Sequence, residues 1–199
     1  KPRGMTSHDV VNRMRRVAHQ RQVGHVGTLD PMADGLLIVC VGPATRIARF
    51  LVGHDKVYQG TITLGAISST YDAEGDITDQ NRPIPDSLAI LRQARLPQLG
   101  QRVQLPPLYS AIKVKGKKLY EYARNGEPVP QKTRNVSIMR FDLMRFHPPH
   151  VEFEARVGSG TYIRSMAHDL GLDLGCGAYL TQLRRTRIGQ FSVDHAGPL

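Results

Sequence analysis

The sequence predicts a mixed α/β domain, of the α+β kind, in which helices flank a largely antiparallel sheet. Segments with strand and helix periodicity are interspersed along the 199 residues without a strict β-α-β rhythm. Apolar residues make up 40% of the chain, which is enough to bury a core. No internal repeat or low-complexity linker separates the segments, so we expect one domain over residues 1–199.

The apolar spacing predicts a helix over about 7–20, capped by Thr6 or Ser7. A short helix is expected over 44–51, and another over about 85–96, where the Pro-Asp pair suits a helix start. A glycine-rich turn precedes a fourth helix, which Gly171 is expected to close. The apolar face of that helix consists of Ile163, Met166, Ala167 and Leu170.

Four segments have the composition of strands. The apolar run 36–41 is expected to be a strand buried on both faces. Segments 56–64, 136–146 and 151–157 are β-branched or alternate apolar with polar residues, which is typical of half-buried strands. The polar stretch 68–85 is rich in Asp and Gly and predicts a long loop or a short hairpin.

The chain carries a formal charge of +10 and has a pI of about 10.0. This charge favours a polyanionic partner such as nucleic acid, although a merely basic surface is the alternative. The two cysteines, Cys40 and Cys176, lie far apart, which argues against a disulfide framework or zinc site and for a reducing cytosol. No apolar run reaches membrane-spanning length, so we expect a cytoplasmic protein without a membrane partner.

Several common site motifs are absent from the sequence. The glycine clusters form neither a Walker A loop nor a dinucleotide fingerprint, and the histidines lack metal-ligand spacing. GSGTY has no downstream triad partners for its serine. The acids Asp72, Glu74 and Asp76 show part of a calcium-loop spacing, but the rest is missing, so a solvated acidic loop is expected.

Asp30 is the first candidate catalytic residue. It stands between Leu29 and Pro31 in GHVGTLDPMADGLLIVCVG, where glycines permit a tight bend and the proline restrains the residue before it. A carboxylate fixed in this way can act as a nucleophile or general base. The alternative is that Asp30 caps a turn. Asp34 is expected to be exposed beside Gly35.

Arg164 lies in the first turn of the fourth helix, between Ile163 and Met166 of its apolar face. A buried arginine requires an acidic or phosphate partner, whereas a surface arginine extends its head to water. Tyr58 lies on the apolar face of strand 56–64 and is suited to a core position as well as to a site.

The middle of the chain combines lysines with aromatic residues, a mixture that suits phosphate contacts and base stacking. An exposed hairpin or helix with solubilising lysines is the alternative. The residues are Lys113, Lys115, Lys117, Lys118, Tyr109, Tyr120 and Tyr122.

Taken together, these segments resemble the TruB family of tRNA pseudouridine synthases, and most closely its bacterial type. The GTLDP block with Asp30 and the GTYIR block with Arg164 are specific in combination, and the resemblance covers nearly the whole chain. The segments occur in the family's order: KPRGMTSHDVV, GHVGTLDPMADGLLIVCVGPATR, YQGTITLGAISSTYDAEGD, PPLYSAIKVKGKKLYEYAR, GSGTYIRSMAHDLG and LRRTRIGQF.

The resemblance implies an isomerase that converts uridine 55 in the T-loop of tRNA to pseudouridine, with neither cofactor nor metal. It also implies the family's fold, a mixed sheet flanked by helices with the active cleft along its middle. Asp30 matches the family's catalytic aspartate and Arg164 would pair with it. Tyr58 would stack on the extruded uracil and is the candidate for removing the C5 proton.

The same resemblance implies four substrate-binding residues. Tyr162 and Leu183 would line the pocket, and His25 would contact the T-loop and help to hold the target base out of the stack. Lys113 and its basic neighbours would follow the phosphates of the T-arm.

Two residues depart from the family's pattern, because Val26 and Asp34 stand where threonines are more usual. Asp34 would add negative charge near the RNA and weaken its binding.

No C-terminal PUA domain is visible, and a monomer is the default expectation. The alternative to an enzyme is a non-catalytic tRNA-binding or RNA-folding module on the same fold, and a hydrolase built on Asp30 lacks a convincing second carboxylate.

Overall fold

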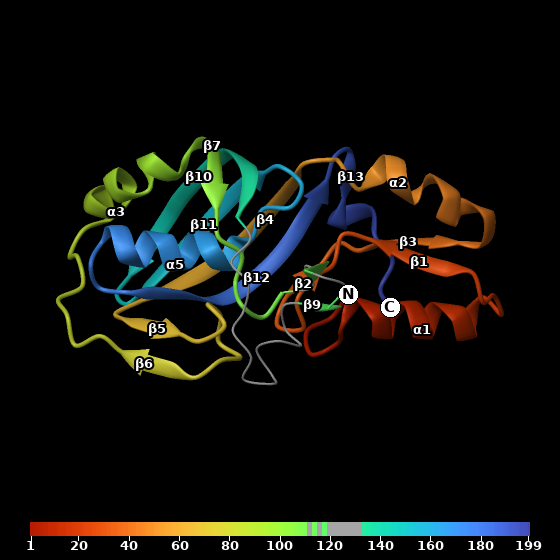
Figure 1. Ribbon diagram of the computed structural model, residues 1–199, viewed down its shortest axis with the longest axis horizontal. Coiled ribbons are helices and arrows are strands. Elements are labelled where there is room, and N and C mark those ends of the chain that lie inside the picture. Colours follow the sequence, from red (N-terminus) through yellow and green to blue (C-terminus); the bar gives the residue numbers. More distant parts are fainter. Residues whose placement is uncertain (111–112, 115–116, 119–132) are drawn as a thin grey trace.

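The computed structural model describes residues 1–110, 113–114, 117–118 and 133–199 (Figure 1). Within them, the main element is a seven-stranded sheet in the order β13-β12-β4-β11-β10-β7, with β2 joined in parallel to β12. All pairs along that order are antiparallel, so the predicted mixed fold is confirmed. The strands are β13 (Phe191–Ser192), β12 (Ala178–Ile188), β4 (Lys56–Leu64), β11 (His150–Val157), β10 (Arg134–His147), β7 (Gly100–Gln104) and β2 (Asp34–Gly35).

Two helices cover one face of this sheet, α5 (Ile163–Asp173) and α3 (Leu88–Ala94) (Figure 1). The predicted apolar face of α5 packs into the core with inward-facing residues of the strands, because alternate residues of a strand point to the same face. The opposite face of the sheet is polar. Among the core residues are Tyr58, Ile62, Leu64, Phe141, Leu143, Phe153, Ala155, Ile163, Met166, Ala167, Leu170, Leu180 and Leu183.

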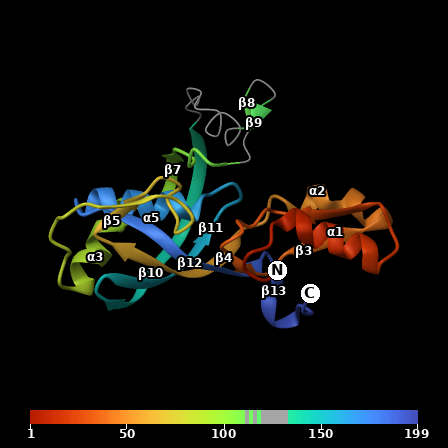
Figure 2. The same cartoon turned by 90° about the horizontal axis from the view of Figure 1, so that it is seen from below.

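A smaller lobe lies beside the sheet at the other end of the molecule (Figure 2). The predicted first helix is confirmed here, since Thr6 and Asp9 form a capping box at the start of α1. The short second helix appears as a 3-10 turn followed by α2. The elements are α1 (Ser7–Val17), β1 (Val23–Val26), β3 (Ile38–Val41), η1 (Gly42–Ile47) and α2 (Ala48–Leu51).

The apolar run 36–41 is less buried than expected. Of its residues, Leu36 and Cys40 are buried and the others are half-buried. The prediction of a strand buried on both faces is wrong, because β3 joins β1 in a two-stranded ribbon and not the large sheet.

The polar stretch after β4 forms an antiparallel hairpin of β5 (Ala66–Ser68) and β6 (Ile77–Asp79), one of the two predicted alternatives. The third helix starts later than expected, at Leu88 with Ser87 as its N-cap. The remaining elements are η2 (Leu96–Gln98), β8 (Lys113–Val114), β9 (Lys117–Lys118) and η3 (Val193–His195).

The central strand β12 is not predicted by the sequence pattern. Its alternation is interrupted by a bulge after Leu180, and the buried position 185 is an arginine. The prediction that Gly171 closes α5 is also wrong, because the helix continues to Asp173. Gly171 instead lets α5 approach the start of β12 closely, since a Cβ atom at position 171 would lie 2.0 Å from the backbone nitrogen of Ala178.

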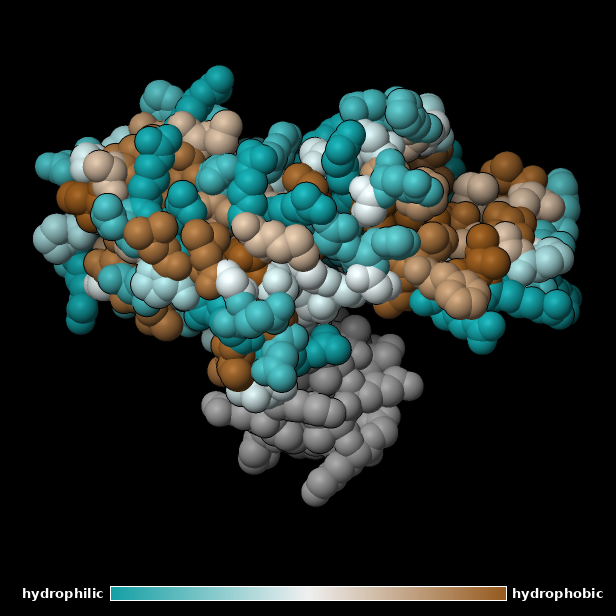
Figure 3. Space-filling model, turned by 90° about the horizontal axis from the view of Figure 1, so that it is seen from above, coloured by the Kyte–Doolittle hydropathy of each residue, from teal (hydrophilic) through white to brown (hydrophobic). Residues whose placement is uncertain are grey.

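Exposed apolar side chains gather at the end of the molecule that holds α2 (Figure 3). They include Ile47, Phe50 and Val52, which lie in or beside η1 and α2. Among the helices in the described ranges, none has the length and apolar character needed to cross a membrane.

Candidate active site

Asp30 lies in the loop between β1 and β2, and its backbone is held on both sides. The Ser7 hydroxyl donates to the carbonyl oxygen of Leu29 at 3.1 Å and accepts from the Leu29 amide at 2.8 Å. The Ala33 amide donates to the carbonyl oxygen of Asp30 at 3.1 Å. Leu29 and Ala33 are buried in the main core. The Asp30 side chain remains 33% exposed, so a ligand can reach a carboxylate that the loop holds in place.

Arg164 approaches Asp30 from the first turn of α5. Its Nη2 donates to Oδ1 of Asp30 at 3.2 Å, and its Nε lies 3.1 Å from Oδ2. The second contact is an ion pair whose N–H direction does not meet hydrogen-bond geometry. The Arg164 side chain is only 6% exposed, so the alternative of a surface arginine is wrong. This fork, in which two nitrogens face two oxygens and one of the contacts is a hydrogen bond, restricts the orientation of the carboxylate as well as its position.

The same guanidinium joins three further groups. Its Nη1 donates to the carbonyl oxygen of Thr70 at 3.1 Å and lies 3.3 Å from Oδ2 of Asp72. Its Nη2 also donates to the carbonyl oxygen of Tyr109 at 3.1 Å. Arg164 therefore connects the Asp30 loop, the β5–β6 hairpin and the segment after β7.

Asp72 belongs to this cluster, although the sequence pattern does not indicate it as a site residue. It was expected in a solvated acidic loop, but it is 2% exposed, and that prediction is wrong for Asp72. The Thr70 hydroxyl and the Glu74 amide donate to its Oδ1, while Oδ2 faces Arg164. The spacing of acids in this loop carries no signal for burial, because the partner comes from α5.

Tyr58 lies on β4 and is buried, 7% exposed, as its position on the apolar face predicts. It belongs to the same core cluster as Leu29, the residue before Asp30, and Leu183. Its register partner on β12 is Arg185, whose guanidinium carbon lies 6.0 Å from the centre of the ring.

Two family models together match residues 15–197, and each contains one member of the ion pair between Asp30 and Arg164. The model described as TruB family pseudouridylate synthase, N-terminal domain, matches residues 15–163, and that of the tRNA pseudouridylate synthase B C-terminal domain matches 164–197. The chain belongs to the TruB family.

Curated members of the TruB family align over almost the whole chain. The proteins named tRNA pseudouridine synthase B from Opitutus terrae and Syntrophotalea carbinolica are 45% and 44% identical over 196 residues, which is 98% of this chain. The chain spans 81% of the first protein and 64% of the second, and 61% of the one from Burkholderia lata.

Solved structures of more distant relatives share the fold. A chain from a Cbf5-Nop10-Gar1 complex has a TM-score of 0.74 and 31% identity, and covers 96% of this chain and 48% of its own length. A chain from an H/ACA RNP bound to a substrate RNA containing 2'-deoxyuridine has a TM-score of 0.71 and 28% identity. The match covers 96% of this chain and 46% of that chain.

The two TruB family models meet between Ile163 and Arg164. The ion pair of Asp30 with Arg164 therefore joins the regions that the models describe separately. In the structure these regions also share one sheet, because β12 lies beside β4.

Tyr162 is the N-cap residue of α5, and its backbone is anchored to β7. The buried Gln104 accepts from the Tyr162 amide at 2.9 Å and donates to its carbonyl oxygen at 3.1 Å. This contact sets the start of α5 and hence the placement of Arg164 two residues later. Leu183 is 4% exposed, so of these two predicted pocket residues Tyr162 is the more accessible.

His25 lies on β1 and is half-buried. Its Nδ1 atom has no hydrogen-bond partner within the ranges that the structure describes. Burial lowers the pKa of His25, and the nearby charges of Arg185 and His8 lower it further. The neutral imidazole is favoured at neutral pH as a result.

The basic middle of the chain is only partly described. Lys113 lies in β8, which pairs with β9, but its side chain is outside the described part. Lys115, Tyr120 and Tyr122 lie outside the described residues altogether. Among described residues, no group of three or more His, Cys, Asp and Glu side chains is arranged to hold a metal ion.

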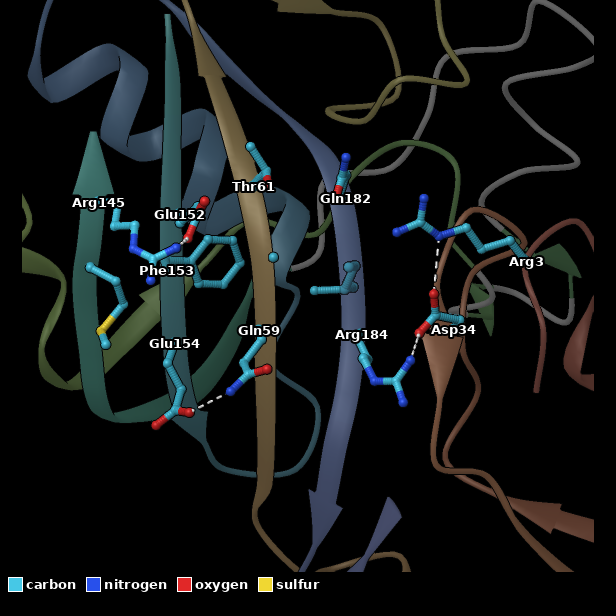
Figure 4. Close-up of a pocket in the computed structure, with 13 residues that line it drawn as sticks. Arg3, Asp34, Gln59, Thr61, Arg145, Glu152, Phe153, Glu154, Gln182 and Arg184 are labelled. Carbon is cyan, nitrogen blue, oxygen red and sulfur yellow. Dashed lines mark hydrogen bonds and ion pairs between the residues drawn. The ribbon is translucent and has the colours of Figure 1, made fainter. Parts of the chain in front are cut away.

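A hollow of about 460 Å³ lies on the polar face of the sheet, away from α5 (Figure 4). Three arginines drawn there form ion pairs: Arg3 and Arg184 both contact Asp34, at 3.0 and 3.2 Å, and Arg145 lies 3.6 Å from Glu152. The neutral Gln59 donates a hydrogen bond to Glu154. The prediction that Asp34 is exposed is wrong, since its side chain is 19% exposed between two arginines. Because its charge is compensated, Asp34 has little capacity to repel RNA.

Proposed function

We propose that the protein isomerises uridine to pseudouridine in tRNA, at nucleotide 55 of the T-loop. The observation that carries this proposal is the fork between Arg164 and Asp30, made by the two family motifs that are specific in combination. An RNA-binding module has no need of a partly exposed aspartate held by a buried arginine. The names of the curated relatives, tRNA pseudouridine synthase B, agree with this assignment.

In the proposed reaction, the N1–C1′ bond of the target uridine breaks and a C5–C1′ bond forms. The proton on C5 is lost and N1 gains one, so the base keeps its composition and no cofactor is consumed. Asp30 acts either by attacking the sugar or the uracil, or by promoting a glycal intermediate. In each route the contacts with Arg164 keep the carboxylate oxygens in one orientation toward the substrate.

The other predicted residues are assigned to the bound nucleotide. Tyr58 stacks on the extruded uracil and accepts the C5 proton, while Leu183 and Tyr162 line the pocket. His25 contacts the T-loop where the base leaves the stack, because N1 and C5 are inaccessible in a stacked loop.

Electrostatics supports an RNA substrate. The net charge of +10 favours the tRNA backbone through release of counterions. Lys113 and its neighbours are assigned to the phosphates of the T-arm. We propose that the protein works as a monomer in the cytoplasm, where tRNA is modified, with one catalytic domain over residues 1–199.

A T-arm stem-loop RNA carrying tritium at C5 of its uridines tests the proposal. Isomerisation releases tritium from nucleotide 55 to water, so wild-type protein is expected to release one equivalent per RNA. A matched RNA with cytidine at that position should release none. Asp30→Asn should abolish release while RNA affinity stays within about threefold, because the substitution preserves shape. Wild-type binding without release would instead favour the non-catalytic RNA-binding module.

A further inference from the structure

Arg185 is a fully buried arginine, 0% exposed, in the C-terminal half of β12. Within the described ranges no carboxylate lies at ion-pair distance from it. Its guanidinium donates instead to carbonyl oxygens: Nε to Leu36 at 2.8 Å, Nη2 to Gly27 at 2.9 Å and Nη1 to Thr28 at 3.4 Å. Burying a charge without an opposite charge is costly, so stability alone does not account for an arginine at this place.

The acceptors belong to both ends of the loop that carries Asp30. Gly27 and Thr28 precede Asp30, and Leu36 follows it. The backbone takes part as well, because the Leu36 amide donates to the carbonyl oxygen of Arg185 at 2.8 Å. Arg185 therefore closes the loop at its base.

The close approach of β12 to the Asp30 loop requires a glycine at position 35. Gly35 has a φ of 103°, and a Cβ atom there would lie 2.3 Å from the carbonyl oxygen of Arg185. It pairs with Arg185 in the short parallel contact between β2 and β12. Only glycine fits both the conformation and the space.

Arg185 also contacts the second proposed catalytic residue. It is the register partner of Tyr58, and its guanidinium lies 6.0 Å from the ring centre, at the outer limit of a cation–π contact. One side chain thus touches the stems of the Asp30 loop and the ring of Tyr58. Burial lowers the pKa of both His25 and Lys56, and the nearby charge of Arg185 lowers each of them further.

We propose that Arg185 is a positioning residue of the active site, which sets the separation between the Asp30 loop and Tyr58. Arg164 orients the carboxylate of Asp30 itself. Arg185 instead holds the backbone at both ends of the Asp30 loop and lies against the ring of Tyr58. This role rests on the proposed function. A displacement of about 1 Å between reacting groups is enough to slow a reaction about 100-fold, so loss of this cross-link should act on the chemical step.

The test compares Arg185→Gln and Arg185→Lys with Arg187→Gln and Arg187→Lys. Arg187 is exposed on the same strand and makes no contact with the loop in the described structure. Tritium release is measured in single turnover with saturating protein, and RNA affinity by filter binding. We expect Arg185→Gln to lose about 100-fold in rate with affinity within threefold. Arg185→Lys should recover part of the rate, because one ammonium reaches fewer of the carbonyls.

Hydrogen exchange separates positioning from general stability. The amides of residues 29–33, except Pro31, should exchange faster in both Arg185 variants, while those of α5 keep wild-type rates. The Arg187 variants should match wild type in rate and exchange. Should Arg185→Gln fail to fold, Arg185→Lys carries the test alone, with an expected loss of about tenfold.

Wild-type rates in a folded Arg185 variant, measured below its melting temperature, overturn the proposal even where that temperature is lowered. A rate loss explained by weaker RNA affinity overturns it as well. An inactive wild-type protein would contradict the proposed function itself, so the two failures are distinguishable.

Discussion

Nη1 of Arg164 lies 3.3 Å from Oδ2 of Asp72, a carboxylate whose side chain is only 2% exposed. Arg164 thereby holds two carboxylates, one buried and one open to solvent. The buried one restricts the guanidinium from behind, and the partly exposed one, Asp30, is the carboxylate that we propose faces the substrate. The orientation of the proposed catalytic carboxylate thus depends on a residue that does not face the ligand.

Asp72→Asn should therefore impair both folding stability and turnover. An amide has no charge to offer Arg164, which then keeps Asp30 as its charged partner. The free energy of unfolding should therefore fall by less than the about 3–5 kcal/mol that a fully broken buried pair costs. We expect at least a tenfold slower single turnover with RNA affinity unchanged. Chemical denaturation and tritium release measure the two effects. Asp76→Asn is the matched control, since Asp76 is exposed in the same loop, and equal effects of both variants would contradict the role of Asp72.

Arg164→Lys should slow turnover by about 100-fold, because a single ammonium does not replace a fork on two carboxylate oxygens. The comparison is Arg140→Lys, an exposed arginine that also contacts two carboxylates, Asp142 and Glu154. That substitution should leave the rate within about twofold, since surface pairs contribute little. An Arg164→Lys variant with the wild-type single-turnover rate would show that the geometry of the fork is unimportant.

Stability should fall as the pH drops below about 6.5, the ordinary pKa of histidine. Burial lowers the pKa of both His25 and His168 in the folded protein, so the unfolded chain binds more protons in this range. Their stabilising effect is complete above pH 6.5 and is lost progressively toward the lower folded pKa values. Urea denaturation between pH 5 and 7.5 measures the slope.

His168→Asn should reduce that slope, whereas the same change at the exposed His147 should leave it as in wild type. His168 stacks flat on Tyr71, with ring centroids 3.9 Å apart, so the substitution also removes a packing contact and lowers stability at all pH values. An unchanged slope in His168→Asn would rule out its buried imidazole as a source of the pH dependence.

Ser7→Ala removes the hydroxyl that holds Leu29 beside the proposed catalytic aspartate. It leaves a buried amide and a buried carbonyl without their partner, which should cost about 1–3 kcal/mol. Turnover should also slow, because Leu29 precedes Asp30. Ser87→Ala is the control, since Ser87 likewise stands at a helix start but its side chain makes no cap hydrogen bond. Thermal unfolding and tritium release distinguish the two variants.

The periodicity of neighbouring residues in the sequence was sufficient to predict several of the helices and strands. The predicted strand 56–64 has the observed bounds of β4, and the predicted helix 7–20 differs from α1 only at its C-terminal end, which is Val17. These segments are periodic and bounded by caps or turns, so the residues that decide their structure are neighbours in sequence. The strand β12 escaped prediction because its buried Arg185 contradicts the apolar alternation expected of a central strand.

The residues of the candidate site likewise fall into those that the sequence indicates and those whose place depends on the tertiary structure. The motifs around Asp30 and Arg164 were recognisable from residue order and family resemblance, since each is a short local turn. The burial of Asp72 and Arg185 was not recognisable, because a charged side chain is buried only where partners from distant segments neutralise or solvate it. Arg164 meets Asp30 across 134 positions of sequence, and Arg185 meets Gly27 across 158. Such meetings are created by the packing of α5 and β12 against the Asp30 loop, and no local periodicity encodes them.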